Sequence, residues 1–262
     1  MQNTLNNVRC KAKFIYIVPS SRSIDEAKTT LQSIDYCSRN SRDVFMIILI
    51  LNGELGNSEL SLAEFDVEIV VLRDVNITNV SAARNLGLNY LERFEYIQSF
   101  ICFLDGGDVL VKVPRISWSP KTIYRTRHYE LSSRGKYDAF LFPLAFKEFV
   151  NPFAIGATYV SSEIIRDMIR FREGRKEDWK YWLECLACGY GVRESNLRTY
   201  VYTTSGSVSH ATRKLPLYKE QVKFFANRSR SNGLTLYLDV VFKFLVHIFL
   251  NSLKWTILRK KK

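Results

Sequence analysis

The 262-residue chain is predicted to be an α/β protein, in which helices flank a mostly parallel sheet and a C-terminal amphipathic helix follows. Three observations predict this fold. Short, almost entirely apolar runs alternate with segments of helical periodicity, as expected for strands that are buried on both faces. Each apolar run stops at residues that favour turns. Hydrophobic residues make up 47% of the chain and charged residues 24%, which is enough apolar sequence for a core.

The first half of the sequence contains the clearest elements. Predicted strands are runs rich in Ile, Val, Leu and Phe, at Lys13–Pro19, Phe45–Leu51, Val67–Leu72 and Phe100–Leu104. Predicted helices have apolar residues three or four positions apart, at Asp25–Cys37 and Ser81–Tyr90. In parallel sheets, ligands bind beyond the carboxyl ends of the strands. The loops expected to hold a ligand are therefore Ser20–Ser23, Asn52–Gly56, Asp74–Ser81 and Asp105–Asp108.

The second half is less regular. Strands are predicted at Tyr137–Phe146 and Ala154–Val160, with short strands and loops at 192–209. Helices are predicted at Ser161–Phe171, Glu177–Cys188 and Leu234–Leu258. No clear linker precedes residue 228, so residues 1–227 are expected to form one domain and residues 228–262 a basic tail.

The net charge of +12 is concentrated in that tail. Residues 221–262 contain nine basic residues and one acid, so the rest of the chain is only mildly basic. A nucleic-acid enzyme more often spreads basic residues along its working face, so no nucleic-acid partner is expected. A basic end beside apolar sequence suits an anionic membrane surface better.

Polar residues recur at four-residue steps in the tail helix and form one stripe, at Thr235, Asp239, Lys243, His247 and Asn251. A helix spanning a bilayer would place Lys243 in hydrocarbon, which costs roughly 2.5–3.5 kcal/mol. A helix lying in the membrane interface keeps the stripe in water and buries its apolar face, so this arrangement is preferred. The alternative is a helix packed on the rest of the chain or on a second copy.

Cysteine usage and the amino-terminal sequence indicate a location. The chain has five cysteines without a disulfide spacing, and an odd count of this kind is typical of a reducing compartment. The start, MQNTLNNVRCKAK, has no apolar run of signal-peptide length. The protein is therefore expected in the cytoplasm, peripheral on the inner face of the plasma membrane. The lone pair Cys185 and Cys188 lies on an apolar helix, which favours buried thiols over a metal half-site.

Two carboxylates, Asp105 and Asp108, directly follow a predicted buried strand. Carboxylates at the end of a strand can hold a divalent cation or bind a ribose. Gly106 and Gly107 between them allow a ligand to approach the backbone closely. An ordinary turn is the alternative, because Asp and Gly are common turn residues.

Charged residues also open two predicted helices. Glu177 and Asp178 either complement the dipole of their helix or provide a general base. Arg84, in the first turn of its helix, is unfavourable for the dipole, so it either binds a phosphate or is simply solvated. The histidines have no metal-binding spacing. His210 is either a site residue or a residue of a surface loop.

Five segments in order carry a family resemblance: KFIYIVPSSR, FMIILILNGE, NVSAARNLGL, FICFLDGGDVL and EDWKYWLECLACGYGV. Together they resemble the nucleotide-sugar glycosyltransferases of family 2, of the type that builds bacterial surface polysaccharides. The match runs from Phe14 to Arg213. The resemblance implies the GT-A fold, with a Rossmann-like sheet, and an inverting transfer of a sugar to a hydroxyl of a glycan acceptor, which is expected to be lipid-linked.

The resemblance also implies roles for residues. Asp178 is expected to be the catalytic base. Donor-binding residues are expected at Pro19, Ser20, Ser21, Asn52, Arg84 and Asp105. Asp105 and Asp108 are expected to hold Mn²⁺ or Mg²⁺. The acceptor side is expected to include Glu177, Trp182 and His210.

The sequence departs from the family pattern at several positions, which include Ser21-Arg22, where Tyr-Asn is common, and Asn79, where Gly is frequent. Gly107 replaces an Asp that usually ligates the metal, and Asn52 replaces an Asp that commonly meets the base. These departures leave two other classes open. One is a non-catalytic protein of the same fold that binds nucleotide sugars, and the other is a membrane-binding scaffold.

Overall fold

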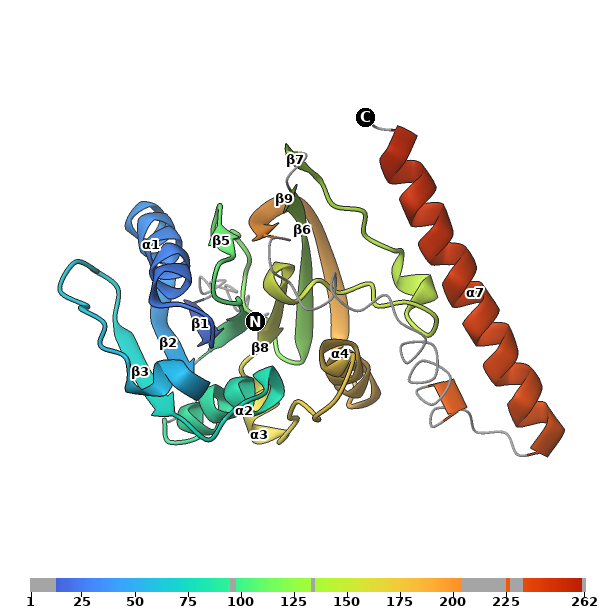
Figure 1. Ribbon diagram of the computed structural model, residues 1–262, viewed down its shortest axis with the longest axis horizontal. Helices are drawn as coiled ribbons and strands as arrows, with labels where there is room; N and C mark the ends of the chain where they lie inside the picture. The colour runs from blue at the N-terminus through green and yellow to red at the C-terminus, as the bar shows by residue number, and fades with distance from the viewer. Residues whose placement is uncertain (1–12, 95–97, 133–134, 204–224, 227–232, 261–262) are drawn as a thin grey trace, which may run out of the picture.

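The computed structural model describes residues 13–94, 98–132, 135–203, 225–226 and 233–260, without the side chains of 233–237 and 254–260. Its strands form one curled sheet in the order β3-β2-β1-β4-β8-β6-β9-β5, with β7 paired to β6 (Figure 1). The strands are β1 Lys13–Ser20, β2 Val44–Asn52, β3 Ile69–Asp74, β4 Ser99–Phe103, β5 Val109–Leu110, β6 Thr122–Ser132, β7 Gly135–Asp138, β8 Thr158–Ser161 and β9 Gly191–Thr203. The helices are α1 Ile24–Ser41, α2 Val80–Leu91, α3 Glu163–Arg166, α4 Glu177–Ala187 and α7 Gly233–Lys260.

The first half of the sheet confirms the predicted fold class. Strands β1 to β4 pair in parallel and are covered by α1 and α2. Successive side chains of β1 face opposite layers, so Tyr16 packs with Leu31 of α1, and Ile17 packs with Ala83 of α2. This two-sided burial explains why the strand sequences are continuously apolar.

The second half of the sheet is mixed, and it differs from the prediction in detail. The predicted strand Tyr137–Phe146 overlaps only the end of β7 and a short 3₁₀ turn at Leu144–Phe146. The predicted helix Ser161–Phe171 is one turn, α3, which stops before Met168 with its backbone in the left-handed region. Residues 192–203 lie in one long strand, β9.

Strand β6 has no counterpart in the prediction because most of its buried side chains are polar. Arg125 is buried and donates Nη1 to the carbonyls of Phe142 and Pro152, both at 2.9 Å. The hydroxyls of Thr126 and Thr199 lie 2.6 Å apart and join β6 to β9. A search for apolar runs misses strands whose buried groups are hydrogen-bonded in this way.

Helix α7 packs against the part of the protein that contains α4, and it lies beyond α4 in Figure 1. Val240 joins the cluster of Trp179 and Phe225, and His247 donates Nδ1 to the carbonyl of Phe149 at 2.7 Å. Burial lowers the pKa of His247 to about 4, so this ring is neutral at pH 7. The prediction of a fully wet polar stripe is therefore wrong at His247, because this residue faces the body of the protein. No helix of the described part has the length and apolarity to cross a membrane.

Candidate active site

The loop after β4 lies against the end of β1, at the carboxyl edge of the parallel strands. Gly106 donates its N–H to the carbonyl of Pro19 at 3.0 Å. A Cβ at Gly106 would lie 2.8 Å from Ser20 Oγ, so only glycine fits there. Pro19 and Ser20 are buried and form the floor of this loop, whereas Ser21 is exposed. The donor loop and the carboxylate loop of the prediction therefore meet.

Asp108 anchors the loop from behind. Its Oδ1 accepts from the backbone N–H of Thr203 at 3.0 Å, and its carbonyl accepts from Thr30 Oγ1 at 2.7 Å. Burial, together with the neighbouring charge of Asp105, raises the pKa of Asp108 well above its ordinary value. Its Oδ2 is buried without a hydrogen-bond partner among the described residues. Asp108 thus ties β9 to the loop, while Asp105 is the more exposed of the two carboxylates.

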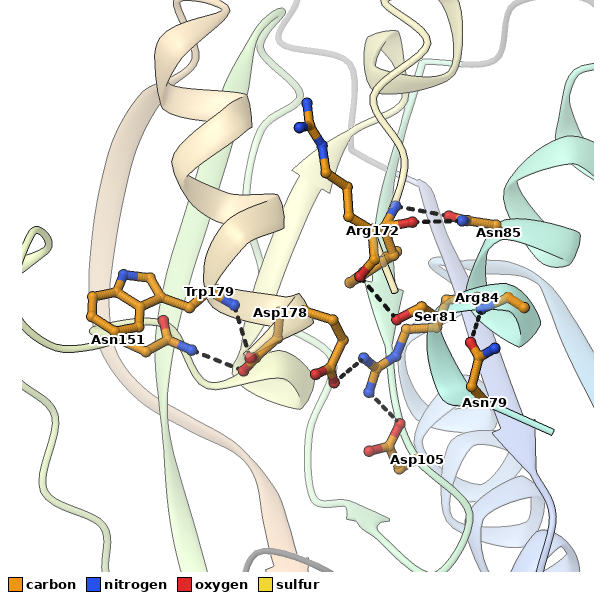
Figure 2. A network of polar contacts seen from close by, with 12 residues as sticks. Asn79, Ser81, Arg84, Asn85, Asp105, Asn151, Arg172, Asp178 and Trp179 are labelled. Carbon is orange, nitrogen blue, oxygen red and sulfur yellow. Dashed lines mark hydrogen bonds and ion pairs between the residues drawn. The ribbon is translucent and has the colours of Figure 1, made fainter. Parts of the chain in front are cut away.

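Arg84 connects the two halves of the site, as Figure 2 shows. Its Nη2 donates to Asp105 Oδ1 at 2.8 Å, and its Nη1 donates to Glu177 Oε1 at 3.3 Å. Its guanidinium also lies 5.1 Å from the ring centre of Phe171. The Arg84 side chain is only 2% exposed. Burial lowers the pKa of Arg84, but the charges of Asp105 and Glu177 outweigh burial and raise it overall.

Asp178 opens α4 next to this ion pair. Asn151 donates Nδ2 to Asp178 Oδ2 at 2.8 Å, and the backbone N–H of Trp179 donates to Oδ1 at 2.8 Å (Figure 2). Burial and the charge of Glu177 raise the pKa of Asp178 to about 6, although Arg84 lowers it. A carboxylate with such a pKa is ionised at neutral pH and still basic enough to accept a proton.

The segment before α4 is fastened to the start of α2. Asn85 exchanges two hydrogen bonds with the backbone of Phe171, each 2.8 Å long. Ser81 Oγ donates to the carbonyl of Arg172 at 3.3 Å, and Asn79 donates to Glu173. Figure 2 shows Ser81 and Asn85 of α2 aimed at this segment, whereas Asn79 is drawn at the N-cap of α2, where it accepts from the backbone N–H of Ala82. Small and polar residues of the Ser-Ala-Ala-Arg-Asn sequence therefore fix the approach to Glu177 and Asp178.

Other predicted site residues lie further from this centre or outside the described residues. Asn52 is buried at the end of β2 and donates Nδ2 to the carbonyl of Ile77 at 3.2 Å. Trp182 is fully buried and packs on Phe153, so it is part of the core. His210 lies outside the described residues.

Sequence reasoning missed Asn151, which is the side chain that holds Asp178. A signal was present, because Asn151 precedes Pro152 and Asn-Pro pairs mark turns. The pairing of Asn151 with Asp178 spans 27 residues, and no local pattern reveals such a contact.

The loop carboxylates fit a divalent cation that arrives with a phosphorylated ligand. Carboxylate oxygens are the donors that Mg²⁺ and similar hard cations prefer, and Mg²⁺ commonly takes one or two of them plus substrate phosphates. Asp105 is suited to ligate such a cation because it is 39% exposed and because only its Oδ1 is hydrogen-bonded to Arg84. Within the described ranges, no three His, Cys, Asp or Glu side chains gather into a metal site of their own.

The comparisons with known proteins support the fold. No protein-family model matches the sequence, and no curated protein is similar to it in sequence. Among solved structures, the chain is similar to a mannosyltransferase from Pyrobaculum calidifontis, determined in complex with GDP-mannose and Mn²⁺. The TM-score is 0.57 at 11% identity, and the match covers 95% of this chain and 79% of that one. The chain therefore has the fold of a glycosyltransferase.

Proposed function

We propose that the protein transfers a sugar from a nucleotide-sugar donor to a hydroxyl group of an acceptor. One observation carries this proposal: a glycosyltransferase fold places a partly buried carboxylate, Asp178, beside an ion-paired bridge to the donor loop. Arg84 is that bridge, since it contacts Asp105 on the donor side and Glu177 on the acceptor side. Sugar transfer needs a base and a donor-binding carboxylate that are held in a fixed relative position. Arg84 provides this by pairing with Asp105 and with Glu177, the neighbour of Asp178.

In the proposed reaction, Asp178 accepts the proton of the acceptor hydroxyl. The hydroxyl oxygen attacks the anomeric carbon, and the nucleoside diphosphate leaves from the opposite side, which inverts the configuration. Asn151 and the N–H of Trp179 hold the two oxygens of Asp178, so the base has a fixed orientation before the acceptor binds. A pKa of about 6 keeps Asp178 ionised at pH 7.

On the donor side, we propose that the nucleoside diphosphate lies over the Pro19–Ser21 loop, between Asn52 and Asp105. Asp105 is the residue that would hold a divalent cation there, and such a cation neutralises charge on the leaving diphosphate. The similar mannosyltransferase, solved with GDP-mannose and Mn²⁺, supports this assignment. Arg84 is too buried to reach a diphosphate directly, so we assign it the task of positioning Asp105 and Glu177.

We propose a lipid-linked glycan as the acceptor, in surface-polysaccharide synthesis at the cytoplasmic face of a membrane. The excess of basic residues after position 220 supports a location at an anionic membrane surface. A second candidate is a nucleotide-sugar-binding protein without transfer activity. Gly107 favours that candidate, because a usual metal-ligating carboxylate is missing at this position.

A panel of nucleotide sugars tests the proposal. We expect one donor to raise the melting temperature, more so with Mn²⁺, since a ligand that binds only the folded state stabilises it. Asp105→Asn should weaken this effect, whereas Asp138→Asn, in an exposed ion pair on β7, should leave it unchanged. The stabilising donor should then be consumed when acceptor hydroxyls are supplied. Stabilisation without consumption would favour the binding protein, and no stabilisation by any donor would reject both candidates.

A further inference from the structure

The outward side of α7 is an apolar stripe. We call this surface the α7 stripe, which consists of Leu238, Phe242, Leu245, Ile248, Phe249 and Leu253. Apart from the neighbours Ile248 and Phe249, successive residues of this set are three or four positions apart, so the set lies on one side of the helix. Phe242 is 59% exposed and Phe249 is 65% exposed. The other exposed large apolar residues of the described part are scattered over several elements, and a contiguous patch of this kind marks an interaction surface.

The opposite side of α7 is already in use. Val240 and Leu250 are buried against the body of the protein, and His247 is hydrogen-bonded to the carbonyl of Phe149. Lys243 and Asp239 neutralise each other in an ion pair 2.8 Å long. The helix therefore cannot turn its stripe inward without breaking these contacts, and the α7 stripe needs a partner from outside.

Charge identifies that partner. The stripe is followed by Lys254, Arg259, Lys260, Lys261 and Lys262, with no acid among the residues after Asp239. An apolar helix face next to a basic cluster is the pattern of helices that lie in the surface of an anionic bilayer. A second copy of the chain, paired through the same stripe, would gain nothing from the basic cluster.

We infer that the α7 stripe is a docking surface for anionic lipid, with α7 lying in the membrane interface. The inner side of α7 contacts Trp179, whose backbone N–H donates to Asp178, and the carbonyl of Phe149, two residues before Asn151, which also donates to Asp178. Docking would therefore present the acceptor side of the site to the membrane. This last step rests on the proposed function, whereas lipid docking does not.

Flotation of the full chain with lipid vesicles tests the inference. The probe is vesicles of phosphatidylcholine with about 30% phosphatidylglycerol, compared with vesicles of phosphatidylcholine alone. We expect flotation with the anionic vesicles, and a loss of about tenfold or more for the double variant Phe242→Ser and Phe249→Ser. The matched control is Tyr36→Ser, an aromatic residue that is 70% exposed on α1, and helix α1 lies at the opposite end of the molecule from α7 in Figure 1. This control should float like the natural protein.

Two results would overturn the inference. One is the absence of flotation, or equal flotation of the double variant and the natural protein. The other is a dimer, detected by light scattering without lipid, that the double variant dissociates while flotation is unchanged. Both substituted rings are mostly exposed, and Phe242 keeps one edge-to-face contact with Phe149, so the melting temperature of the double variant should fall only slightly and that of Tyr36→Ser should stay near that of the natural protein. Donor-induced stabilisation, measured separately, distinguishes a failure of lipid docking from a failure of the proposed function.

Discussion

The ion-paired bridge at Arg84 allows a quantitative prediction for Arg84→Met. Methionine keeps much of the length of the side chain but removes the charge that faces Asp105 and Glu177. Removing one partner of a fully buried ion pair costs about 3–5 kcal/mol. Asp105 is 39% exposed and Glu177 is 21% exposed, so water can reach both carboxylates and lowers this cost. We expect a loss of about 2–3 kcal/mol in the free energy of unfolding.

A loss of this size corresponds to a fall of about 5–10 °C in melting temperature for a domain of this length. The control is Arg198→Met, which breaks an exposed ion pair with Asp138 and should lower the melting temperature by about 3 °C or less.

Arg84→Met should also change the pH dependence of transfer. Asp178 is active as a base when ionised, and the positive charge of Arg84 lowers its pKa. Removing that charge raises the pKa, so the acid limb of kcat/KM, near pH 6 in the natural protein, should move to higher pH. An unchanged melting temperature together with an unmoved acid limb would refute the reasoning, because Arg84 would then neither stabilise the fold nor lower the pKa of Asp178.

Three further changes test separate parts of the structure. Asn151→Ala should lower kcat by about 10–100-fold with little effect on donor binding, because Asp178 loses a fixed orientation; an unchanged kcat would contradict this. Gly107→Asp should destabilise the protein by about 1 kcal/mol or more, because φ is +96°, a backbone conformation that residues with a Cβ rarely adopt; increased stability with tighter Mn²⁺ binding would contradict it. A chain ending at residue 232 should melt at a lower temperature, because Trp179 loses its cover; an unchanged melting temperature would show that α7 adds no stability.

The first half of the fold was predictable because its strands are marked by features of the local sequence. Strands β1 to β4 are buried on both faces, so their sequences are continuously apolar and end at turn residues. Strand β6 was not predictable in this way. From the sequence alone, Arg125 is expected on the surface. It is buried because the fold places the carbonyls of Phe142 and Pro152 within hydrogen-bond distance of its guanidinium.

The candidate site was predictable as a set of residues but not as a network. Asp105, Arg84 and Asp178 were singled out from their positions at the ends of strands and the starts of helices, but position alone left an ordinary structural alternative for each, and only the family resemblance assigned them roles. The pairing of Arg84 with Asp105 and Glu177 joins residues 21 and 93 positions apart, which no sequence pattern shows. The polar stripe of α7 was predictable from its four-residue spacing. The hydrogen bond from His247 to the carbonyl of Phe149 was not, because the two residues are far apart in the sequence.

The most direct test of the central claim is the turnover of Asp178→Asn as a function of pH, with the donor that stabilises the protein. If Asp178 is the base, this variant should fold and bind the donor normally, lose turnover by a factor of about 10²–10⁴, and no longer show the acid limb near pH 6. Glu177→Gln, the matched control, should lose less activity. Turnover of Asp178→Asn close to that of the natural protein, with the same acid limb, would contradict the account.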